Sequence, residues 1–514
     1  MTSLSTKAPT DAPRSDDAVT GPRQWANRWA APVTAMLVAL ALSARGLTDR
    51  ALWLDESFSL GATEQLRGTI ESTGGTMAAY YVMLTAWTRI AGTSMVSLRL
   101  PSALLVSAAV LVTVAWARRF LRPGRELWAA ALAIAALPSI TRFGQEARSY
   151  ALVMFVTAGC WALAAGAVTK QEAGRPDAAR PYWLALAALS AVGEAAHGLF
   201  VLQLLALVAS LLWLPGRREH LRSLVPSGIA VVAVALLMAR QGASKVADWV
   251  PPLSLTQAGA AAEDLAGPAL VALIVICLAV AGATSLTRRT AGDPVARWLQ
   301  IAPVAWAVAP PALLLALSLI RPYMIGRYVV ASAPALALLA GVGATAVDRA
   351  WRDPDRPRRR LLAPATAILA LALLLGQVAL AHEPGHGWDD AATIVAEQAR
   401  PGDALLFPMP VLRSPFDAAW RDLDLDLTAT APELLGSDRP LGTVRRLHEY
   451  WGLDQVEAGL ADADRLWLVH ATDPGWGDRE LDRILDWAPV DEGFDVVSHA
   501  RLAGGVQVVL LERT

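Results

Sequence analysis

Apolar residues in this chain gather in runs about 15 to 22 residues long, and stretches rich in arginine separate many of them. A helix of that length crosses the hydrocarbon core of a membrane, where the backbone can only bond to itself. The pattern therefore predicts a polytopic α-helical membrane protein with about eleven transmembrane helices, at 30–47, 99–117, 126–141, 150–169, 182–196, 198–214, 223–240, 268–286, 299–320, 328–347 and 361–381.

The N-terminal end of the chain departs from this pattern. Residues 1–29 are polar, a composition typical of a disordered cytoplasmic tail. No small-residue cleavage site follows the first apolar run, so we expect a retained span rather than a signal peptide. The transmembrane domain is then expected over 30–381, with a long first external loop at 48–98.

The C-terminal end of the chain also departs from the pattern of long apolar runs, and it is acidic. The last 133 residues hold 25 acidic residues against 11 Arg and no Lys. Short apolar runs that read as strands alternate there with amphipathic helical patterns. We expect a small external α/β domain over 382–514, with strands at 403–410, 465–471 and 506–513 and helices at 388–400 and 478–488. Its acidity is typical of a soluble surface.

Basic residues set the expected orientation. With a cytoplasmic N-terminus, the inside segments hold 23 Lys and Arg, whereas the outside loops before residue 382 hold 11. Lys and Arg favour the cytoplasmic side of a membrane. This bias predicts a multi-pass protein of the plasma membrane with its C-terminal domain outside. It also puts the acidic pair Asp55 and Glu56 outside, in the first external loop.

That loop contains a further apolar stretch at 77–92, with Tyr80, Tyr81 and Trp87. The stretch is long enough to span, but a span there would invert every later loop and its charge bias. Aromatic side chains favour the headgroup region. We therefore expect a helix that lies in the membrane interface.

The composition excludes several classes of protein. The two cysteines, Cys160 and Cys277, both lie in apolar runs, which excludes a disulfide framework or a CxxC metal site. There is no GxxxxGK[ST] and no strand-linked GxGxxG motif, so a nucleotide-driven motor is not indicated. A net charge of -1 gives no reason to expect a nucleic-acid partner.

Ionisable and aromatic residues collect at the expected outer edge of the spans. They come from separate segments: Arg142, Glu146 and Arg148 in 142–150, Glu194 and His197 in 193–198, and Arg321, Tyr323, Arg327 and Tyr328 in 321–330. Such groups are costly at membrane depth, which makes them functional candidates. Together with Asp55 and Glu56 they suit a lipid-borne substrate with an anionic headgroup.

The residue types indicate a reaction. Arginine binds phosphate bidentately and keeps its charge when desolvated. A nearby carboxylate can take a proton from an attacking hydroxyl as a general base. Glycosyl transfer from a lipid-phosphate sugar, by an inverting displacement with phosphate as the leaving group, needs one base and no covalent enzyme intermediate.

Structural roles for the same residues stay open at this point. Asp55 and Glu56 also suit the first turn of the helix that follows them. Arg148 and Arg327 also suit the membrane interface, where long basic side chains reach the headgroups. His197 also suits a structural position at a chain break, and Glu194 a solvated helix end.

Four segments in order carry a resemblance to a known family: WLDESFSL (53–60), YYVMLTAWTRIAG with SLRLPSALL (80–105), RFGQEARSYAL (142–152) and RPYMIGRYVVASAPALALLAG (321–341). Over roughly residues 30–347 the chain resembles the bacterial C-type (GT-C) membrane glycosyltransferases of the protein O-mannosyltransferase and aminoarabinose-transferase kind. The resemblance implies a multispanning enzyme that takes sugar from a polyprenyl-phosphate donor on the outer face of the membrane.

The resemblance also implies roles for particular residues. An acid in the first external loop is the family's catalytic base, which falls on Asp55 with Glu56 beside it. Glu146 and Arg148 match the "QEAR" segment, and Arg327 and Tyr328 match the "RY" segment. These residues are expected to hold the donor phosphate or to shape its pocket, and the substrate pocket is expected to include Tyr80, Tyr81 and His197.

One segment departs from the family. Many relatives have HPPLYY where this chain has TMAAYY at 76–81, so the histidine and both prolines are absent. A role of that histidine toward an acceptor or a metal cannot be carried over. We therefore expect no required cofactor and no metal-ligating residue, and the need for a divalent metal stays open.

Two other functions remain as alternatives. A flippase for lipid-linked sugars would place ionisable groups near mid-membrane at broken helices in repeated halves, whereas here they gather at the outer edge. A binding or assembly protein that works through its acidic domain would leave the polar cluster unexplained. Mannose is the default sugar from the resemblance, with another hexose or a pentose open. The acceptor is a lipid, a polysaccharide or a protein.

Overall fold

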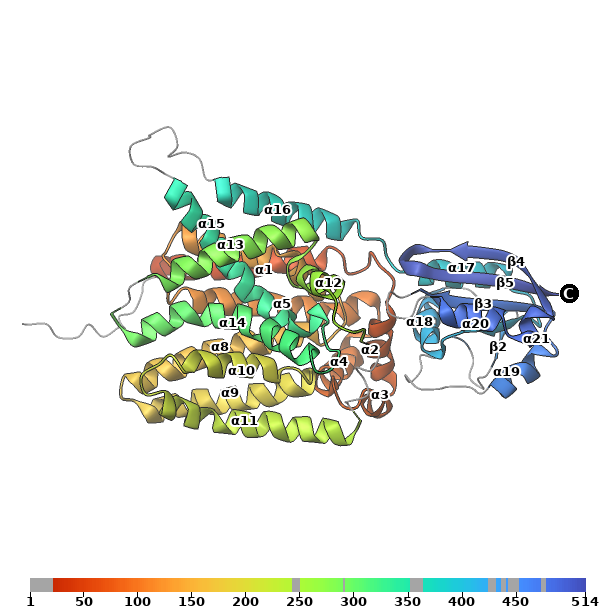
Figure 1. Ribbon diagram of the computed structural model, residues 1–514, viewed down its shortest axis with the longest axis horizontal. Coiled ribbons are helices and arrows are strands. Elements are labelled where there is room, and N and C mark those ends of the chain that lie inside the picture. Colours follow the sequence, from red (N-terminus) through yellow and green to blue (C-terminus); the bar gives the residue numbers. More distant parts are fainter. Residues whose placement is uncertain are drawn as a thin grey trace, which may run out of the picture.

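The computed structural model describes residues 22–242, 250–289, 292–351, 364–423, 431–435, 441, 453–472 and 478–514. The chain forms a bundle of long helices, and a small α/β domain sits at one end of that bundle (Figure 1). The expectation of a mostly helical chain with a C-terminal α/β domain is confirmed.

Seven helices in the described residues are long and apolar enough to cross a membrane. The central one joins the 3-10 turn η2 (Gly326–Ser332) to α15 (Ala333–Trp351), and 94% of its apolar window is buried. The other six are α5 (Met95–Ala117), α8 (Tyr150–Glu172), α11 (Arg217–Arg240), α13 (Ala269–Thr287), α14 (Pro294–Ser318) and α16 (Pro364–Ala381). An eighth candidate is the pair α6 (Arg125–Ala135) and α7 (Pro138–Gly144), bent by 44° at the break before Pro138.

The described residues thus support seven or eight of the eleven expected spans. All eleven segments overlap helices, but three of the helices do not meet the same criteria of length, hydropathy and charge. They are α1 (Pro22–Ala44), α9 (Pro176–Ala196) and α10 (Val201–Leu211). Helix α1 begins at Pro22, and only its Arg28–Ala44 part enters the test for a membrane-crossing helix.

The expected loop 48–98 is largely helical. It contains α2 (Leu54–Glu64), α3 (Leu66–Ser72) and α4 (Ala78–Ala91). Helix α4 is the expected 77–92 helix, and with 14 residues it is shorter than the membrane-crossing helices. All three helices lie at the end of the bundle that faces the α/β domain (Figure 1).

Small residues let the central helix pack closely on its neighbours. A Cβ atom added at Gly343 of α15 would overlap the backbone carbonyl of Leu278 in α13, and one at Gly282 of α13 would overlap Leu339. Small residues at helix interfaces allow this close approach in membrane bundles. The close packing of α13 on α15 therefore depends on these two glycines.

The C-terminal domain is built around a five-stranded mixed sheet of order β2-β1-β3-β5-β4. Strand β1 (Ala404–Leu406) pairs in parallel with β2 (Glu433–Leu434) and β3 (Arg465–Ala471), and β5 (Val506–Arg513) runs antiparallel to β3 and β4 (Phe494–Arg501). All three expected strands and both expected helices are present, the helices as α17 (Trp388–Gln398) and α20 (Arg479–Leu485). Helices α18 (Arg413–Asp422), α19 (Leu453–Leu460) and α21 (Ala488–Asp491) complete the domain.

This domain packs directly on helix α2. Ala51 belongs to the same buried cluster as Phe416 and Trp420 of α18, and Leu54 packs against that cluster. Arg421 of α18 also pairs with Glu64 at the end of α2. The domain therefore covers the segment that carries Asp55 and Glu56.

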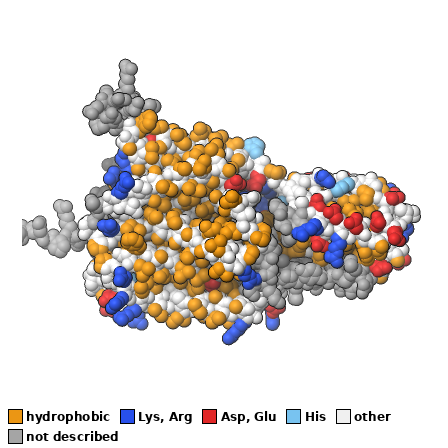
Figure 2. Space-filling model, in the orientation of Figure 1, with side chains coloured by type: hydrophobic (Ala, Val, Ile, Leu, Met, Phe, Trp, Pro, Cys, Tyr) orange, Lys and Arg blue, Asp and Glu red, His pale blue; other side chains and the backbone are white. Residues whose placement is uncertain are grey.

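The bundle and the domain have different surfaces in Figure 2. The face of the bundle in view is broadly hydrophobic, and basic side chains gather near the end away from the domain. The domain shows acidic side chains with some basic ones among them. Exposed leucines and valines on α11, α13 and α16 fit a lipid-facing surface. Length, hydropathy and this surface agree on a multi-pass membrane protein.

Candidate active site

Asp55 and Glu56 lie in the first turn of α2, which begins at Leu54 after an extended Trp53. The Ser57 hydroxyl donates to the carbonyl of Leu54 at 2.6 Å, and no side chain caps the helix. Two acids in a first turn also suit the helix dipole. The two carboxylates nevertheless have different surroundings, because Glu56 is 1% exposed and the side chain of Asp55 is 20% exposed.

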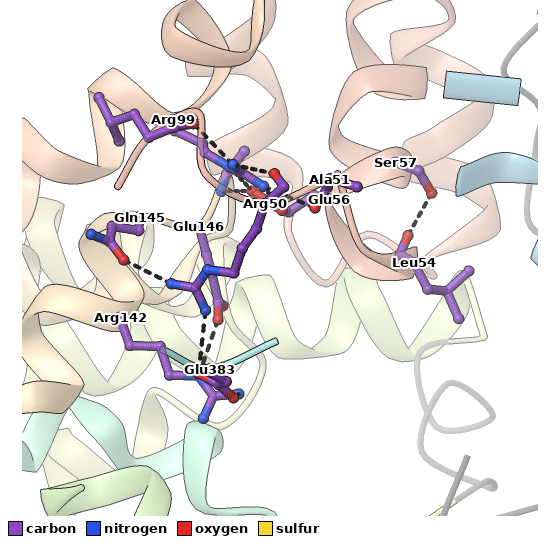
Figure 3. Close-up of polar contacts among 12 residues, drawn as sticks. Arg50, Ala51, Leu54, Glu56, Ser57, Arg99, Arg142, Gln145, Glu146 and Glu383 are labelled. Atoms are coloured by element: carbon purple, nitrogen blue, oxygen red, sulfur yellow. Dashed lines mark hydrogen bonds and ion pairs between the residues drawn. The ribbon is translucent and has the colours of Figure 1, made fainter. Parts of the chain in front are cut away.

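Glu56 forms a buried ion pair with Arg99 of α5 (Figure 3). Arg99 donates to both carboxylate oxygens, at 2.8 and 2.6 Å, and also to the carbonyls of Leu47, Arg50 and Ala51. The amide of Ala147 donates to Glu56 Oε1 at 2.8 Å. Glu56 therefore ties the start of α2 to α5 and to the segment between α7 and α8.

Asp55 faces two arginines that are distant in the sequence. Its Oδ2 lies 3.4 Å from Nη2 of Arg148 and 3.8 Å from Nη2 of Arg327. Arg148 also donates to the backbone carbonyl of Asp55 at 2.9 Å. Burial of Arg148 would lower its pKa, but Asp55 and nearby tyrosines more than offset this and raise it. The structure thus brings together three of the residues chosen from the sequence, from α2, the α7–α8 segment and η2.

Glu146 belongs to a second group of charges, centred on Arg142. The Nε of Arg142 donates to Glu146 Oε1 at 3.3 Å, and its Nη atoms lie 3.8 Å from Asp264 and 4.0 Å from Glu383. Arg50 pairs with Glu383 at 3.2 Å from the other side (Figure 3). Burial raises the pKa of Glu146 to about 7, although Arg142 opposes the shift.

Aromatic rings surround the arginines. The ring of Tyr328 lies 5.0 Å from that of His197, which in turn lies 5.9 Å from Tyr150. The guanidinium of Arg327 lies over Trp53 at 5.4 Å, and that of Arg148 lies 6.0 Å from the ring of Tyr150. Burial lowers the pKa of His197 to about 4, and the two arginines act in the same direction. His197 is therefore a neutral, ring-packed side chain at the edge of the site.

Tyr80 and Tyr81 are fully buried in α4. Tyr80 shares a hydrogen bond with Ser102 of α5 at 3.3 Å, and the Tyr81 hydroxyl donates to the sulfur of Met77 at 3.8 Å. Burial raises the pKa of both hydroxyls, and Arg148 opposes that shift in each. Both hydroxyls are therefore close enough to Arg148 for its charge to affect them.

Four charged residues of the site, Arg50, Arg99, Asp264 and Glu383, have no role assigned from the sequence. Arg50 falls in the expected loop 48–98, and Arg99 is the first residue of the expected span 99–117. Asp264 of α12 (Leu255–Ala266) falls between two expected spans, and Glu383 falls at the start of the expected domain 382–514. The only signal was Arg99 itself, the one charge within the apolar helix α5. Glu194, in contrast, is buried and accepts from the amide of Val201, so it is a structural cap rather than a solvated end.

The charges of the site fall into two halves. Asp55 with Arg148 and Arg327 has an excess of one positive charge, whereas the Arg142 group has three carboxylates and, with Arg50, two arginines. Arg327 adjoins both halves, since it also stabilises the ionised forms of Glu146 and Asp264. Among the described residues, no three His, Cys, Asp or Glu side chains are grouped to hold a metal ion.

The helical bundle with its C-terminal mixed sheet has the fold of the GT-C membrane glycosyltransferases. It is similar to ArnT from Cupriavidus metallidurans in the apo state, with a TM-score of 0.58 and 18% identity over 93% of this chain and 97% of that one. The same protein bound to undecaprenyl phosphate gives a TM-score of 0.57 at 16% identity, with the same coverage of both chains.

The oligosaccharyltransferase AglB from Archaeoglobus fulgidus, in complex with an inhibitory peptide and a dolichol-phosphate, is also similar. Its TM-score is 0.53 at 12% identity, over 87% of this chain and 69% of that one. No family model and no curated protein matches the sequence. These likenesses confirm the expected GT-C-like fold, and at such low identity they carry no further than the fold.

Proposed function

We propose that this protein is a membrane glycosyltransferase that moves a sugar from a polyprenyl-phosphate donor to an acceptor hydroxyl. The observation that carries the proposal is the convergence of Arg148 and Arg327 on the carboxylate of Asp55. Two cations for a phosphate and one carboxylate for a proton are the groups that such a transfer needs. Helix α2, which carries Asp55, lies at the end of the bundle next to the C-terminal domain (Figure 1), and the face of the bundle seen in Figure 2 is broadly hydrophobic, as a lipid-facing surface would be.

The arginines suit the donor phosphate. A guanidinium forms paired, charge-assisted bonds to phosphate oxygens and stays charged when water is excluded. Among proteins with a similar fold, ArnT has a structure with bound undecaprenyl phosphate and AglB one in complex with a dolichol-phosphate. A long isoprenoid tail would lie among the apolar helices, with its phosphate at Arg148 and Arg327.

The reaction then follows from the exchange of partners at these arginines. A bound phosphate competes with Asp55 for Arg148 and Arg327, which leaves the carboxylate available to the acceptor. As the acceptor oxygen attacks the anomeric carbon, its proton passes to Asp55. The bond from that carbon to the phosphate oxygen breaks, and polyprenyl phosphate leaves with the electron pair. The anomeric configuration inverts, because one displacement occurs and no glycosyl-enzyme forms.

The other candidate residues support this centre. In this proposal Glu56 holds Asp55 in place through α2. The substrate pocket is lined by Tyr328, His197, Tyr80 and Tyr81, whose ring or hydroxyl groups are affected by the charge of Arg148 or Arg327. We propose mannose as the first sugar to test, with arabinose next, and an acceptor on a lipid, polysaccharide or protein of the cell envelope. We also propose that the site and the C-terminal domain face outward, since the basic loops lie at the opposite end.

The proposal is tested by complementing a deletion strain. Envelope glycans and glycoproteins are compared by mass spectrometry for strains that carry the wild-type chain, Asp55→Asn, or the control Glu71→Gln. Glu71 is an exposed acid of α3 outside the site. Loss of one sugar from a defined product in the deletion strain, restored by wild type and control but not by Asp55→Asn, is expected. Restoration by Asp55→Asn would refute the role of the base.

The flippase alternative has a different outcome in the same strains. A carrier that only moves lipid-linked sugars across the membrane does not need a proton acceptor at the anomeric carbon. Its loss would leave the sugar lipid on the inner leaflet and would diminish every product made from it. A uniform loss of many products, with full rescue by Asp55→Asn, would therefore favour the carrier.

A further inference from the structure

The site holds one carboxylate that the proposed reaction does not use. Glu146 follows α7, and its side chain is 14% exposed. Its Oε1 accepts from Arg142, while its Oε2 is buried and has no hydrogen-bond partner among the residues that the structure describes. A buried acceptor without a partner is costly, by about 1–3 kcal/mol. Such an oxygen in a substrate site is suited to accept a hydrogen bond from a bound ligand.

The negative charge of Glu146 determines which part of the donor this side chain can bind. A carboxylate repels phosphate, so the expectation that Glu146 binds the phosphate directly is unfavourable. Glu146 lies instead in the acidic half of the site, where Asp264 and Glu383 also pair with Arg142. Figure 3 shows Glu146, Arg142 and Glu383 in this half. Arg327 adjoins this half and also contacts Asp55. A group joined to the phosphate and rich in hydroxyl donors would fit there.

We propose that Glu146 determines donor specificity by accepting a hydrogen bond from a hydroxyl of an uncharged sugar on the polyprenyl phosphate. This inference rests on the proposed function and adds the class of sugar and the residue that recognises it. The phosphate lies at Arg148 and Arg327, and the sugar lies toward Glu146. A site built to bond a hydroxyl discriminates strongly against a ligand that lacks it, because its own polar group is then left unpaired.

The structure also explains how the carboxylate is aimed. Arg142 fixes Oε1, and Arg142 is itself held by Asp264 of α12 and by Glu383 of the link to the C-terminal domain. Glu383 is held in turn by Arg50. Asp264 and Glu383 are therefore positioning residues in this proposal, since they act on the sugar through Arg142 and Glu146.

The test measures binding of three probes to purified protein in lipid nanodiscs: undecaprenyl phosphate alone, and the same lipid carrying mannose or arabinose. Wild type is expected to bind at least one sugar lipid about tenfold to a hundredfold more tightly than the bare lipid, as one bond to a charged group would give. Glu146→Ala should remove that preference and leave the affinity for the bare lipid unchanged. Glu146→Gln should keep part of the preference, and Glu71→Ala all of it.

Three results would overturn the inference. In the first, Glu146→Ala retains the wild-type preference for the sugar lipid. In the second, Glu146→Ala lowers the affinity for the bare lipid as much as the affinity for the sugar lipid, as a structural defect would. In the third, wild type binds neither sugar lipid more tightly than the bare lipid. Failure of the proposed function itself would appear in the binding of undecaprenyl phosphate alone. Wild type would not bind this lipid, or Arg327→Ala would bind it as tightly as wild type does.

Discussion

The buried pair of Glu56 and Arg99 gives the sharpest prediction about the architecture of the site. Arg99→Met keeps an unbranched apolar stem of similar shape but removes the guanidinium. That change leaves a carboxylate that is 1% exposed with a single remaining hydrogen bond, from the amide of Ala147. It also leaves the carbonyls of Leu47, Arg50 and Ala51 without their donor.

The expected magnitude follows from the loss of one member of a buried ion pair, which costs about 3–5 kcal/mol. At about 2 °C per kcal/mol for a large domain, the thermal midpoint should fall by about 6–10 °C. Because Glu56 also ties α2 to the α7–α8 segment, the distance between Asp55 and Arg148 should change as well. We therefore expect Arg99→Met to lower the turnover of bound donor more than the donor affinity.

The assay is thermal unfolding of purified protein in one detergent, for wild type, Glu56→Gln, Arg99→Met and the double variant. The double variant should be more stable than Arg99→Met, because it no longer buries an unpaired charge. Arg67→Met, at an exposed pair on α3, is the control and should change the midpoint little. A midpoint for Arg99→Met equal to that of the control, or additive effects in the double variant, would refute this reasoning.

Two further predictions concern stability. Burial raises the pKa of Glu146 from 4.5 to about 7; Arg142 and Arg327 oppose this shift, and Glu56 adds to it. The protonated Glu146 side chain therefore stabilises the folded protein below pH 4.5, and this stabilisation is lost as the pH rises through 7. The stability gained by Glu146→Gln over wild type should therefore grow by about 3 kcal/mol between pH 4 and pH 8; an equal difference in thermal midpoint at both would contradict it. Gly343→Ala should lower the midpoint, because its Cβ meets the backbone of α13, at a cost of about 1–3 kcal/mol. The control Gly228→Ala in α11 meets no atom within 4 Å and should not lower it; equal behaviour of the two would contradict the close packing.

Much of the fold could be predicted from the periodicity of the sequence. The strands 465–471 and 506–513 were found at their expected residues, as β3 and β5. The expected spans were only partly supported, because some apolar runs form helices shorter than a membrane crossing needs. Helix α10, with 11 residues, is the clearest case.

Part of the candidate site could also be predicted. The rule that Lys and Arg stay inside put Asp55, Arg148 and Arg327 on one face, and the structure brings these three side chains together. The rest depends on tertiary contacts that sequence patterns do not encode. Arg99 and Glu56 are 43 residues apart, and Glu383 reaches Arg50 from 333 residues away. The buried ion pair that gives Glu56 its structural role could not be predicted from the sequence.

The central claim is that Asp55 serves a transfer from a polyprenyl-phosphate sugar. The most direct measurement follows release of undecaprenyl phosphate from a synthetic sugar donor, with radiolabelled sugar, purified protein and an envelope extract as acceptor. Wild type and Glu71→Gln should release the lipid and label the extract together. Asp55→Asn should bind the donor with near-normal affinity and release almost nothing. Release at the wild-type rate by Asp55→Asn would contradict the account.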